Sequence, residues 1–255
     1  MRSIWIIARN TYREIIRDRI LFGIIIFAFF LIGISVVLGE LSFSEQARIS
    51  ANFGFSGIQI GTSILAVFVG SSLVAREIEK QTILTLLARP ISRTQFLVGK
   101  FLGLSMVMWT VVCGLSLVLL AVVSFLELKL SLGFGVALWG IMLEAMVLLS
   151  LALFFGSFAR PVMTVIFAGS FFLLGHWVSS LGYFIEKSKS ESFKILGTVI
   201  SYIVPNLETF NWRAAPIYQL EISGYEVLRA TGYALGWGLF LMILTSVIFN
   251  KKDFI

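Results

Sequence analysis

The chain has 255 residues and a formal net charge of +6; 58% of its residues are hydrophobic and only 13% are Asp, Glu, Lys or Arg. Soluble domains carry roughly 25% charged residues, so this composition excludes an ordinary water-soluble fold. Apolar runs of about 18 residues or more are typical of transmembrane helices, and such runs recur along the whole chain. We therefore predict an all-α polytopic membrane protein with a single domain over residues 1–255.

The positive charge does not indicate nucleic-acid binding, because the cations cluster at the ends of apolar runs, where membrane topology alone explains them. Cys113 is the single cysteine, which excludes an internal disulfide and a cysteine-cluster metal site. No metal or other cofactor is predicted in this chain, and the lipid bilayer is its expected surroundings.

Residues 1–19 open the chain with a helical pattern. Arginines at positions 9, 13 and 17 form a cationic stripe, and the apolar residues at helical spacing are Ile4, Trp5, Ala8, Tyr12, Ile15 and Ile16. This pattern predicts an amphipathic helix that lies in the headgroup plane with its apolar face toward lipid. A basic tail without structure, which would only set the topology, is the alternative.

Six spans follow along the chain. We predict them at residues 20–38, 57–75, 96–125, 134–158, 162–182 and 224–249. An even number places both termini on one side, and thirteen of the 20 Lys and Arg residues lie on that side. The positive-inside rule therefore predicts cytoplasmic termini. Pairs of glycines four residues apart (Gly57/Gly61, Gly99/Gly103 and Gly232/Gly236) are expected to pack neighbouring spans closely.

The extracytoplasmic side is predicted to hold loops at 39–56 and 128–133 and a larger region at 183–223. That region begins with the solvated run EKSKSES and continues into ILGTVISYIV, residues 195–204. Ten apolar residues are too short to span, so they predict an interfacial helix that ends at Pro205. Ser223 and Glu226 have the spacing of a capping box and predict the start of the last helix.

The cytoplasmic stretch AREIEKQTILTLLARPISRTQ, residues 75–95, separates spans two and three. Ile83, Leu86 and Leu87 recur at helical spacing, which predicts a short amphipathic surface helix that ends before Pro90. Ser92 and Gln95 form a second capping-box pattern that starts span three. Flanking charges alone could keep the loop cytoplasmic, but acidic residues contribute little to orientation. We therefore interpret the charged helix as a docking element for a soluble partner.

The residues AREIEKQTILTLLARPISRTQFLVGKF, 75–101, resemble the first cytoplasmic loop of the type 2 ABC-transporter permeases. That family shows a pair of acids, Gly-Thr, a Leu-rich turn, Arg-Pro, Ser-Arg and Gly-Lys. The matching residues here are Glu77, Glu79, Thr82, Leu86, Leu87, Arg89, Pro90, Ser92, Arg93, Gly99 and Lys100, with Gln81 where Gly is usual. The turn FGSFARPVMTVIFAG (155–169) is similar to the family's link between spans four and five. The segment PNLETFNWR (205–213) is similar to a loop of the branch described as multicopper-enzyme-maturation permeases.

The resemblance implies a half-transporter of the bacterial inner membrane that pairs with a second permease copy and two cytoplasmic P-loop ATPase subunits. Those subunits would bind ATP and magnesium. A homodimer is expected, although the family also contains heterodimers. In the family the charged loop, here 76–93, is a coupling helix that sits in a groove of the ATPase. The coupling residues this implies are Arg76, Glu77, Glu79, Lys80, Thr82, Leu86, Leu87, Arg89, Pro90, Ser157, Arg160 and Pro161.

The chain itself is not predicted to be an enzyme. A P-loop requires GxxxxGK followed by Ser or Thr, and the single Gly-Lys pair, Gly99-Lys100, is followed by Phe101. ATP hydrolysis is therefore expected in a partner subunit, and no catalytic residue is predicted.

Ionisable residues at bilayer depth are costly, so each needs a reason. Glu144 lies near the middle of the fourth span and His176 near the outer end of the fifth. Glu144 is interpreted either as part of the translocation path or as a hydrogen-bonded acid inside the bundle, and His176 as a hydrogen-bonded packing residue. In the family the first, second and fifth spans border the path, which implicates Ser63, Ser71 and Ser72. Met142 and Met146 flank Glu144 and would suit a copper path, but methionine also fills gaps in ordinary cores.

The function predicted from these features is a permease subunit of an ATP-driven exporter. One alternative is a non-transporting scaffold that passes motion to an extracytoplasmic partner through residues 183–223. A secondary transporter would require several intramembrane acids and broken helices, and the spans offer Glu144 alone and no internal proline. The apolar spans suit lipids, glycolipids or hydrophobic peptides as cargo, and they suit simple packing equally well.

Overall fold

The structure, a computed structural model, describes residues 2–40, 45–79, 92–128 and 130–251, without the side chains of residues 2, 20 and 72–79. All regular secondary structure in the described ranges is helical, and no strand occurs in them. Six helices are long and apolar enough to cross a membrane, which confirms the predicted fold class. They are α2 (Arg19–Glu40), α3 (Gln46–Glu79), α5 (Arg93–Phe125), α6 (Leu132–Gly156), α7 (Pro161–Lys187) and α10 (Gly224–Lys251).

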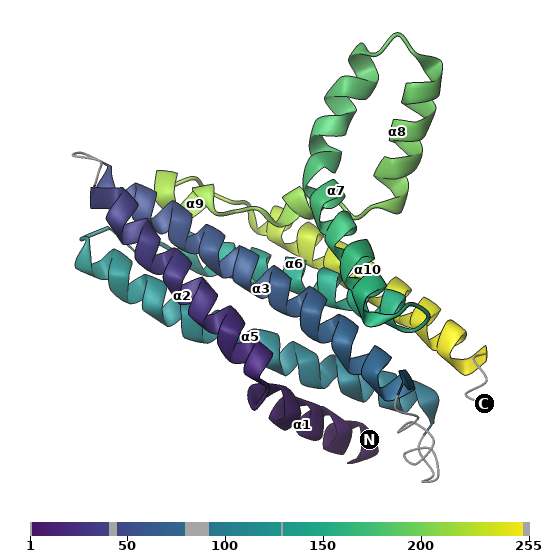
Figure 1. Cartoon of the computed structure of the whole chain (residues 1–255). Coiled ribbons are helices and arrows are strands. Elements are labelled where there is room, and N and C mark those ends of the chain that lie inside the picture. Colours follow the sequence, from purple (N-terminus) through teal and green to yellow (C-terminus); the bar gives the residue numbers. More distant parts are fainter. Residues whose placement is uncertain (1, 41–44, 80–91, 129, 252–255) are drawn as a thin grey trace.

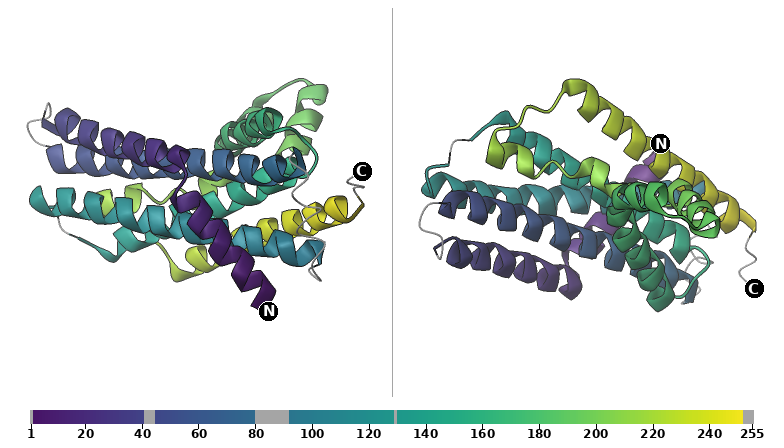
Figure 2. Two further views of the ribbon diagram at one scale, coloured as in Figure 1. Left: turned by 60° about the horizontal axis from the view of Figure 1, so that its bottom comes forward. Right: turned by 90° about the horizontal axis from the view of Figure 1, so that it is seen from above.

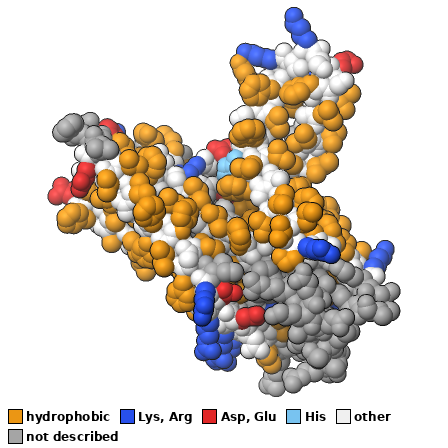
Figure 3. Space-filling model, viewed as in Figure 1, with side chains coloured by type: hydrophobic (Ala, Val, Ile, Leu, Met, Phe, Trp, Pro, Cys, Tyr) orange, Lys and Arg blue, Asp and Glu red, His pale blue; other side chains and the backbone are white. Residues whose placement is uncertain are grey.

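The start of α1 (Arg2–Ile16) and the end of α10 lie at the same end of the bundle, together with the end of α3 (Figure 1). We call this the inner end and the opposite one the outer end. Lys and Arg side chains gather at the inner end and at the tip of the hairpin that α7 forms with α8 (Glu191–Ile203), and the surface between them is largely hydrophobic (Figure 3). This distribution is the one expected of a multi-pass membrane protein.

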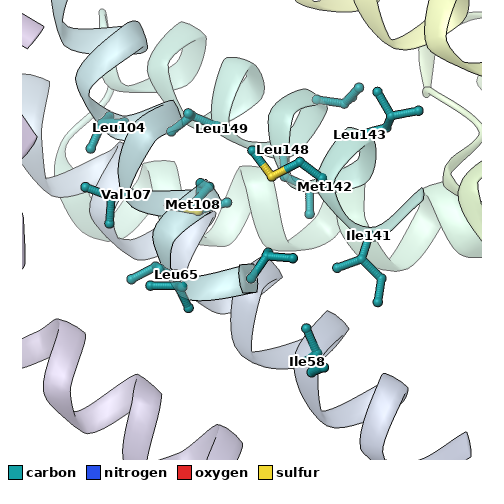
Figure 4. Close-up of a cluster of buried hydrophobic side chains, with 14 of the residues drawn as sticks. Ile58, Leu65, Leu104, Val107, Met108, Ile141, Met142, Leu143, Leu148 and Leu149 are labelled. Carbon is teal, nitrogen blue, oxygen red and sulfur yellow. The ribbon is translucent and has the colours of Figure 1, made fainter. Parts of the chain in front are cut away.

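Helices α3 and α6 form the centre of the bundle, since most of their residues are buried, whereas α2, α7 and α10 lie at its edge. Figure 4 shows the core where α3, α5 and α6 meet, with Leu65, Met108 and Leu148 among its fully buried side chains. Close backbone approach joins α2 to α3, because a Cβ built on Gly61 would lie 2.9 Å from the Cβ of Ala28. The predicted role of Gly57 and Gly61 in packing neighbouring spans is confirmed.

The second span corrects the sequence analysis at both ends. Helix α3 begins at Gln46 rather than near residue 57, so most of the predicted loop 39–56 is helical. Its added turns bury Ala51 and Phe55, and the hydroxyl of Ser50 donates to the carbonyl of Ser35 on α2 at 3.1 Å. At the inner end α3 continues to Glu79, since no glycine or proline interrupts residues 71–79. Arg76, Glu77 and Glu79 thus lie on an extension of the second span instead of opening a separate helix.

Helix α1 (Arg2–Ile16) confirms the predicted N-terminal helix. Its predicted position, with the apolar face against lipid, differs from the structure, because part of that face contacts another helix. Helix α1 packs along α5, where a Cβ on Gly103 would lie only 2.6 Å from the carbonyl oxygen of Ala8. Lys100, itself buried, approaches the Glu14 carboxylate at 3.7 Å. The Gly99/Gly103 pair therefore packs against α1 rather than against a neighbouring span. A Cβ built on either glycine of the third pair, Gly232 and Gly236, would meet no atom of a neighbouring helix within 4 Å in the described structure, so the predicted packing role of this pair is wrong.

The outer region also differs in detail from the prediction. Helix α8 (Glu191–Ile203) runs antiparallel to α7, and together they form a hairpin that stands away from the bundle (Figures 1 and 2). The run 186–192 is partly helical, because α7 continues to Lys187. The short helices η1 (Leu207–Phe210) and α9 (Ala214–Tyr218) follow.

The predicted caps differ in outcome. The capping box of Ser92 and Gln95 at the start of α5 is confirmed. The hydroxyl of Ser223 accepts the N–H of Tyr225 instead of that of Glu226, so α10 begins as predicted but without the expected hydrogen bond from Glu226 to that hydroxyl.

Candidate functional site

The most buried ionisable group in the described spans is Glu144, 1% exposed at the middle of α6. Two residues of α3 hold it. The side-chain amide of Gln59 donates to Glu144 Oε2 at 2.5 Å, and the hydroxyl of Ser63 donates to Oε1 at 3.3 Å. Gln59 and Ser63 are four residues apart, so both side chains point from the same face of α3. The carboxyl group thereby ties α6 to α3.

His176 brings α7 into the same network. Its Nδ1 lies 3.0 Å from the carbonyl oxygen of Phe172, which makes Nδ1 the donor, and its Nε2 then accepts from Gln59 Nε2 at 3.2 Å. The side-chain amide of Gln59 therefore donates hydrogen bonds to both Glu144 and His176. His176 Nε2 is also 3.7 Å from Glu144 Oε1. Three spans, α3, α6 and α7, thus meet at one hydrogen-bonded cluster, which we call the Glu144 cluster (Gln59, Ser63, Glu144 and His176).

A second set of polar contacts lies toward the outer end on the same face of α3. Arg213 donates from Nη1 to the hydroxyl of Ser56 at 2.8 Å and from Nε to Asn211 Oδ1 at 2.8 Å. Asn211 in turn donates to Glu208 Oε1 at 2.6 Å. Ser56, Gln59 and Ser63 follow i, i+3, i+7 spacing and form one polar stripe on α3. This stripe runs from the outer segment 206–213 to the Glu144 cluster.

The outer segment 204–217 is wedged into the bundle rather than lying free as a loop. Leu207 and Phe210 are fully buried. A Cβ on Gly140 of α6 would lie 2.2 Å from the carbonyl oxygen of Phe210, and one on Gly175 of α7 would lie 2.8 Å from that of Pro205. The backbone N–H of Asn206 donates to the hydroxyl of Tyr233 on α10 at 2.8 Å. The segment therefore contacts α3, α6, α7 and α10 above the Glu144 cluster.

The structure unites some of the predicted intramembrane residues and separates others. Ser63, Glu144 and His176 meet in one cluster, as the interpretation of Glu144 as a hydrogen-bonded acid requires. Ser71 is buried elsewhere and donates to the carbonyl of Phe68 at 2.9 Å, and the side chain of Ser72 is outside the described part.

Met142 and Met146 do not support a copper path beside Glu144. They line a groove toward α5 and α10, on another face of α6 from Glu144. Within the described ranges no three His, Cys, Asp or Glu residues come together as metal ligands would.

The sequence analysis missed Ser56, Gln59 and Arg213. The signal for the first two was present, because Ser56, Gln59 and Ser63 recur at helical spacing in and just before the predicted second span. Arg213 carries no such signal. Its contact with Ser56 joins residues 157 positions apart in the chain and exists only in the folded bundle.

The predicted coupling residues are described only in part. Arg76, Glu77 and Glu79 lie on the last turns of α3, without described side chains. The others of the first loop lie outside the described residues: Lys80, Thr82, Leu86, Leu87, Arg89 and Pro90.

The second predicted coupling segment is the turn between α6 and α7. The hydroxyl of Ser157 is buried against the carbonyl of Phe154 at 2.7 Å, Arg160 is exposed, and Pro161 is the first residue of α7. A Cβ on Gly156 would lie 3.8 Å from the carbonyl oxygen of Ser71, so this turn is beside α3 near its inner end. From Ser71, α3 runs eight more residues, or about 12 Å, beyond the turn.

Comparison with known proteins agrees with this architecture. The model of a family described as "ABC-2 family transporter protein" matches residues 5–254. A protein of Pseudomonas aeruginosa named "Probable ABC transporter permease protein NosY" is 27% identical over 210 residues. That alignment covers 78% of this chain and 65% of the relative, which is slightly less than two thirds of the relative's length.

Proposed function

The chain belongs to the ABC-2 family of transporter proteins, and on this premise we propose that it is the permease subunit of an ATP-driven exporter. Two permease copies would form the translocation path, and two separate cytoplasmic ATPase subunits would drive it. The proposed location is the bacterial inner membrane, with both termini in the cytoplasm. The family match confirms the resemblance to type 2 ABC-transporter permeases, which residues 75–101 carry.

The observation that carries the coupling proposal is that α3 is one continuous helix, longer than the bilayer is thick. Its 34 residues make a helix about 51 Å long, and the hydrocarbon core of a bilayer is about 30 Å thick. One unbroken helix therefore contains both the charged residues 76–79 and the polar stripe that reaches the Glu144 cluster. No proline lies between the stripe and residues 76–79. Gly70, the glycine between them, packs against α6, where a Cβ built on it would lie 2.7 Å from that of Ala152. A displacement of the inner end by an ATPase would therefore reach the stripe along this helix.

The proposed cycle begins when ATP binding draws the two ATPase subunits together. The ATPases then displace α3 through residues 76–93 and α7 through the turn at 157–161. Both helices hold the Glu144 cluster, so the cluster has to adjust when they move relative to α6. The two permease copies would alternate between closed and open arrangements in this way.

A second candidate function follows from the outer segment. Residues 204–217 contact four helices and connect to the polar stripe through Arg213 and Ser56. Motion of α3 would thus reach the outer surface even without a cargo in the membrane. A permease-like scaffold that passes this motion to an extracytoplasmic protein would use the same contacts.

The test of coupling is the double variant Glu77→Lys/Glu79→Lys in the purified complex. We expect the subunit to remain in the membrane while cargo-dependent or permease-dependent ATPase activity of the partner is lost. The matched control is Glu186→Lys/Glu191→Lys, which makes the same charge change at the exposed tip of the α7–α8 hairpin. Unchanged ATPase stimulation in the first variant would refute docking through residues 76–79.

The partner assignment is tested by purification in mild detergent with identification by mass spectrometry. One P-loop ATPase per permease copy is the expected result. An additional extracytoplasmic protein in stoichiometric amount would favour the scaffold function. Absence of any ATPase, even after crosslinking from position 79, would overturn the proposal.

A further inference from the structure

A large apolar groove lies between α5, α6 and α10, separate from the Glu144 cluster. Its volume is about 480 Å³, which is within the range of roughly 300–1,000 Å³ for small-molecule sites. The lining runs from Val98 to Trp109 on α5, from Trp139 to Ser150 on α6 and from Thr231 to Met242 on α10. Each stretch covers eleven residue steps, or about 16 Å of helix.

Three polar side chains in the lining, Trp139, Ser150 and Thr231, are already engaged in hydrogen bonds. Trp139 Nε1 donates to the hydroxyl of Thr231 at 3.0 Å, and that hydroxyl donates to the carbonyl of Val227 at 2.8 Å. The hydroxyl of Ser150 donates to the carbonyl of Met146 at 2.8 Å. These three groups offer no free donor, and nearly all of the remaining lining is apolar, so a polar occupant would lose the hydrogen bonds it makes to water. The groove therefore selects hydrocarbon.

The shape of the groove favours a single chain that reaches in from the inner side. Trp109 and Trp139 pack with ring centroids 5.8 Å apart at its outer end, where Thr231 also lies. One leaflet of a bilayer is about 15 Å deep, half of the hydrocarbon thickness of about 30 Å. Trp109 lies 16 residues beyond Arg93 on α5, or about 24 Å, so a tail that starts at the inner end would fill the inner part of the groove, and the groove extends past the middle of the bilayer. Three methionines in the lining, Met142, Met146 and Met242, adapt readily to a flexible occupant.

Positive charge lies beyond the inner end of the groove. Arg93 precedes Val98 by five residues, or about 8 Å along α5, and its guanidinium donates to the carbonyls of Phe249 and Asn250 at the end of α10. Lys251 is the last residue of α10. Basic residues at the membrane surface attract anionic lipid headgroups.

We propose that this groove binds one acyl chain of an anionic phospholipid whose headgroup lies at the inner end, near Arg93 and Lys251. The site does not depend on the transport function proposed above, because its test measures lipid binding and not transport. Arg93, the last residue of the coupling loop 76–93, is the one residue that the two proposals share. It would hold the lipid as a constitutive part of the subunit.

The chain offers a matched pair of variants for the test. A Cβ on Gly238 would meet only Ser150 Oγ, at 3.6 Å, so Gly238→Leu fills the groove without a backbone clash. Gly236 is two residues away on α10, does not line the groove and has no other group within 4 Å. Gly236→Leu therefore adds the same side chain outside the groove and serves as the control.

The probe is a phosphatidylglycerol with a photoreactive diazirine near the end of one acyl chain, mixed into nanodiscs with the full-length protein. We expect labelling concentrated on residues 98–109 and 139–150, at least fivefold weaker in Gly238→Leu and unchanged in Gly236→Leu. Excess unlabelled phosphatidylglycerol should compete in the wild-type protein, a measurement that does not depend on any variant folding. Labelling that resists competition, or that is equal in both variants, would overturn the acyl-chain site. Equal labelling by the matching phosphatidylcholine would overturn the role given to Arg93 and Lys251.

Discussion

The substitution Gln59→Leu removes the donor that connects two spans to α3 while it keeps a side chain of similar size. Gln59 donates to Glu144 Oε2 at 2.5 Å and to His176 Nε2 at 3.2 Å, and it is itself 4% exposed. Glu144 would keep only Ser63, at 3.3 Å. The variant therefore separates the polar contact from the packing of the same position.

The expected cost follows from the two lost bonds. Interhelical side-chain hydrogen bonds in membrane proteins contribute about 0.6 kcal/mol on average and up to about 1.7 kcal/mol. Two of them give roughly 1–3 kcal/mol, with the larger value expected because Glu144 is left with an unsatisfied buried acceptor. The measurement is unfolding by SDS in mixed micelles, read as a shift in the midpoint. Transport or partner ATPase activity would be measured in parallel.

A double-mutant cycle shows whether the contact itself is responsible. If Gln59 and Glu144 act together, Gln59→Leu combined with Glu144→Leu should lose about 1 kcal/mol less than the sum of the two single losses. Asn52→Leu, an exposed position on the same helix, is the control and should be neutral. Additive losses in the cycle, or equal losses in Gln59→Leu and Asn52→Leu, would refute the role of the cluster in joining the spans.

Further outcomes follow from single contacts. Gly140→Ala forces a Cβ to within 2.2 Å of the carbonyl oxygen of Phe210, so it should destabilise by roughly 1–3 kcal/mol and speed hydrogen exchange over residues 204–217. Gly135→Ala, with no neighbour within 4 Å, should change neither. Gly103→Ala would place a Cβ 2.6 Å from the carbonyl oxygen of Ala8 and should loosen α1. The measurement is maleimide labelling of an Ile7→Cys reporter in a Cys113→Ser background, which should become several-fold faster. Gly114→Ala on α5, where a Cβ would meet nothing within 4 Å, should leave the labelling rate unchanged. Trp139→Phe loses the bond to Thr231 and should cost about 0.5–1.5 kcal/mol, while Trp177→Phe, 72% exposed, should cost less than half of that by the same SDS titration.

The sequence predicted most of the fold because the bilayer restricts what a chain can do. In hydrocarbon every backbone polar group has to be satisfied within a helix, so apolar length alone located six spans and their order. Local chemistry located the start of α5, where Ser92 and Gln95 satisfy each other's orphan N–H groups. Pattern also predicted α1, and the residues 75–101 carried the family, which the match over residues 5–254 confirms.

The sequence did not determine which faces meet, because that depends on contacts between distant residues. The same glycine spacing occurs on α3, α5 and α10. The glycines contact α2 in the first case and α1 in the second, and in the third a Cβ would meet no neighbouring helix within 4 Å. Glu144 and His176 were each recognised as costly in lipid, but only the tertiary structure supplies Gln59 as the donor common to both. Composition and periodicity located the six spans and α1, although not the ends of α3, since helix formation depends on short-range sequence and solvent. The Glu144 cluster, the burial of the outer segment 204–217 and the apolar groove depend on how the six helices pack, and only the tertiary structure decided them.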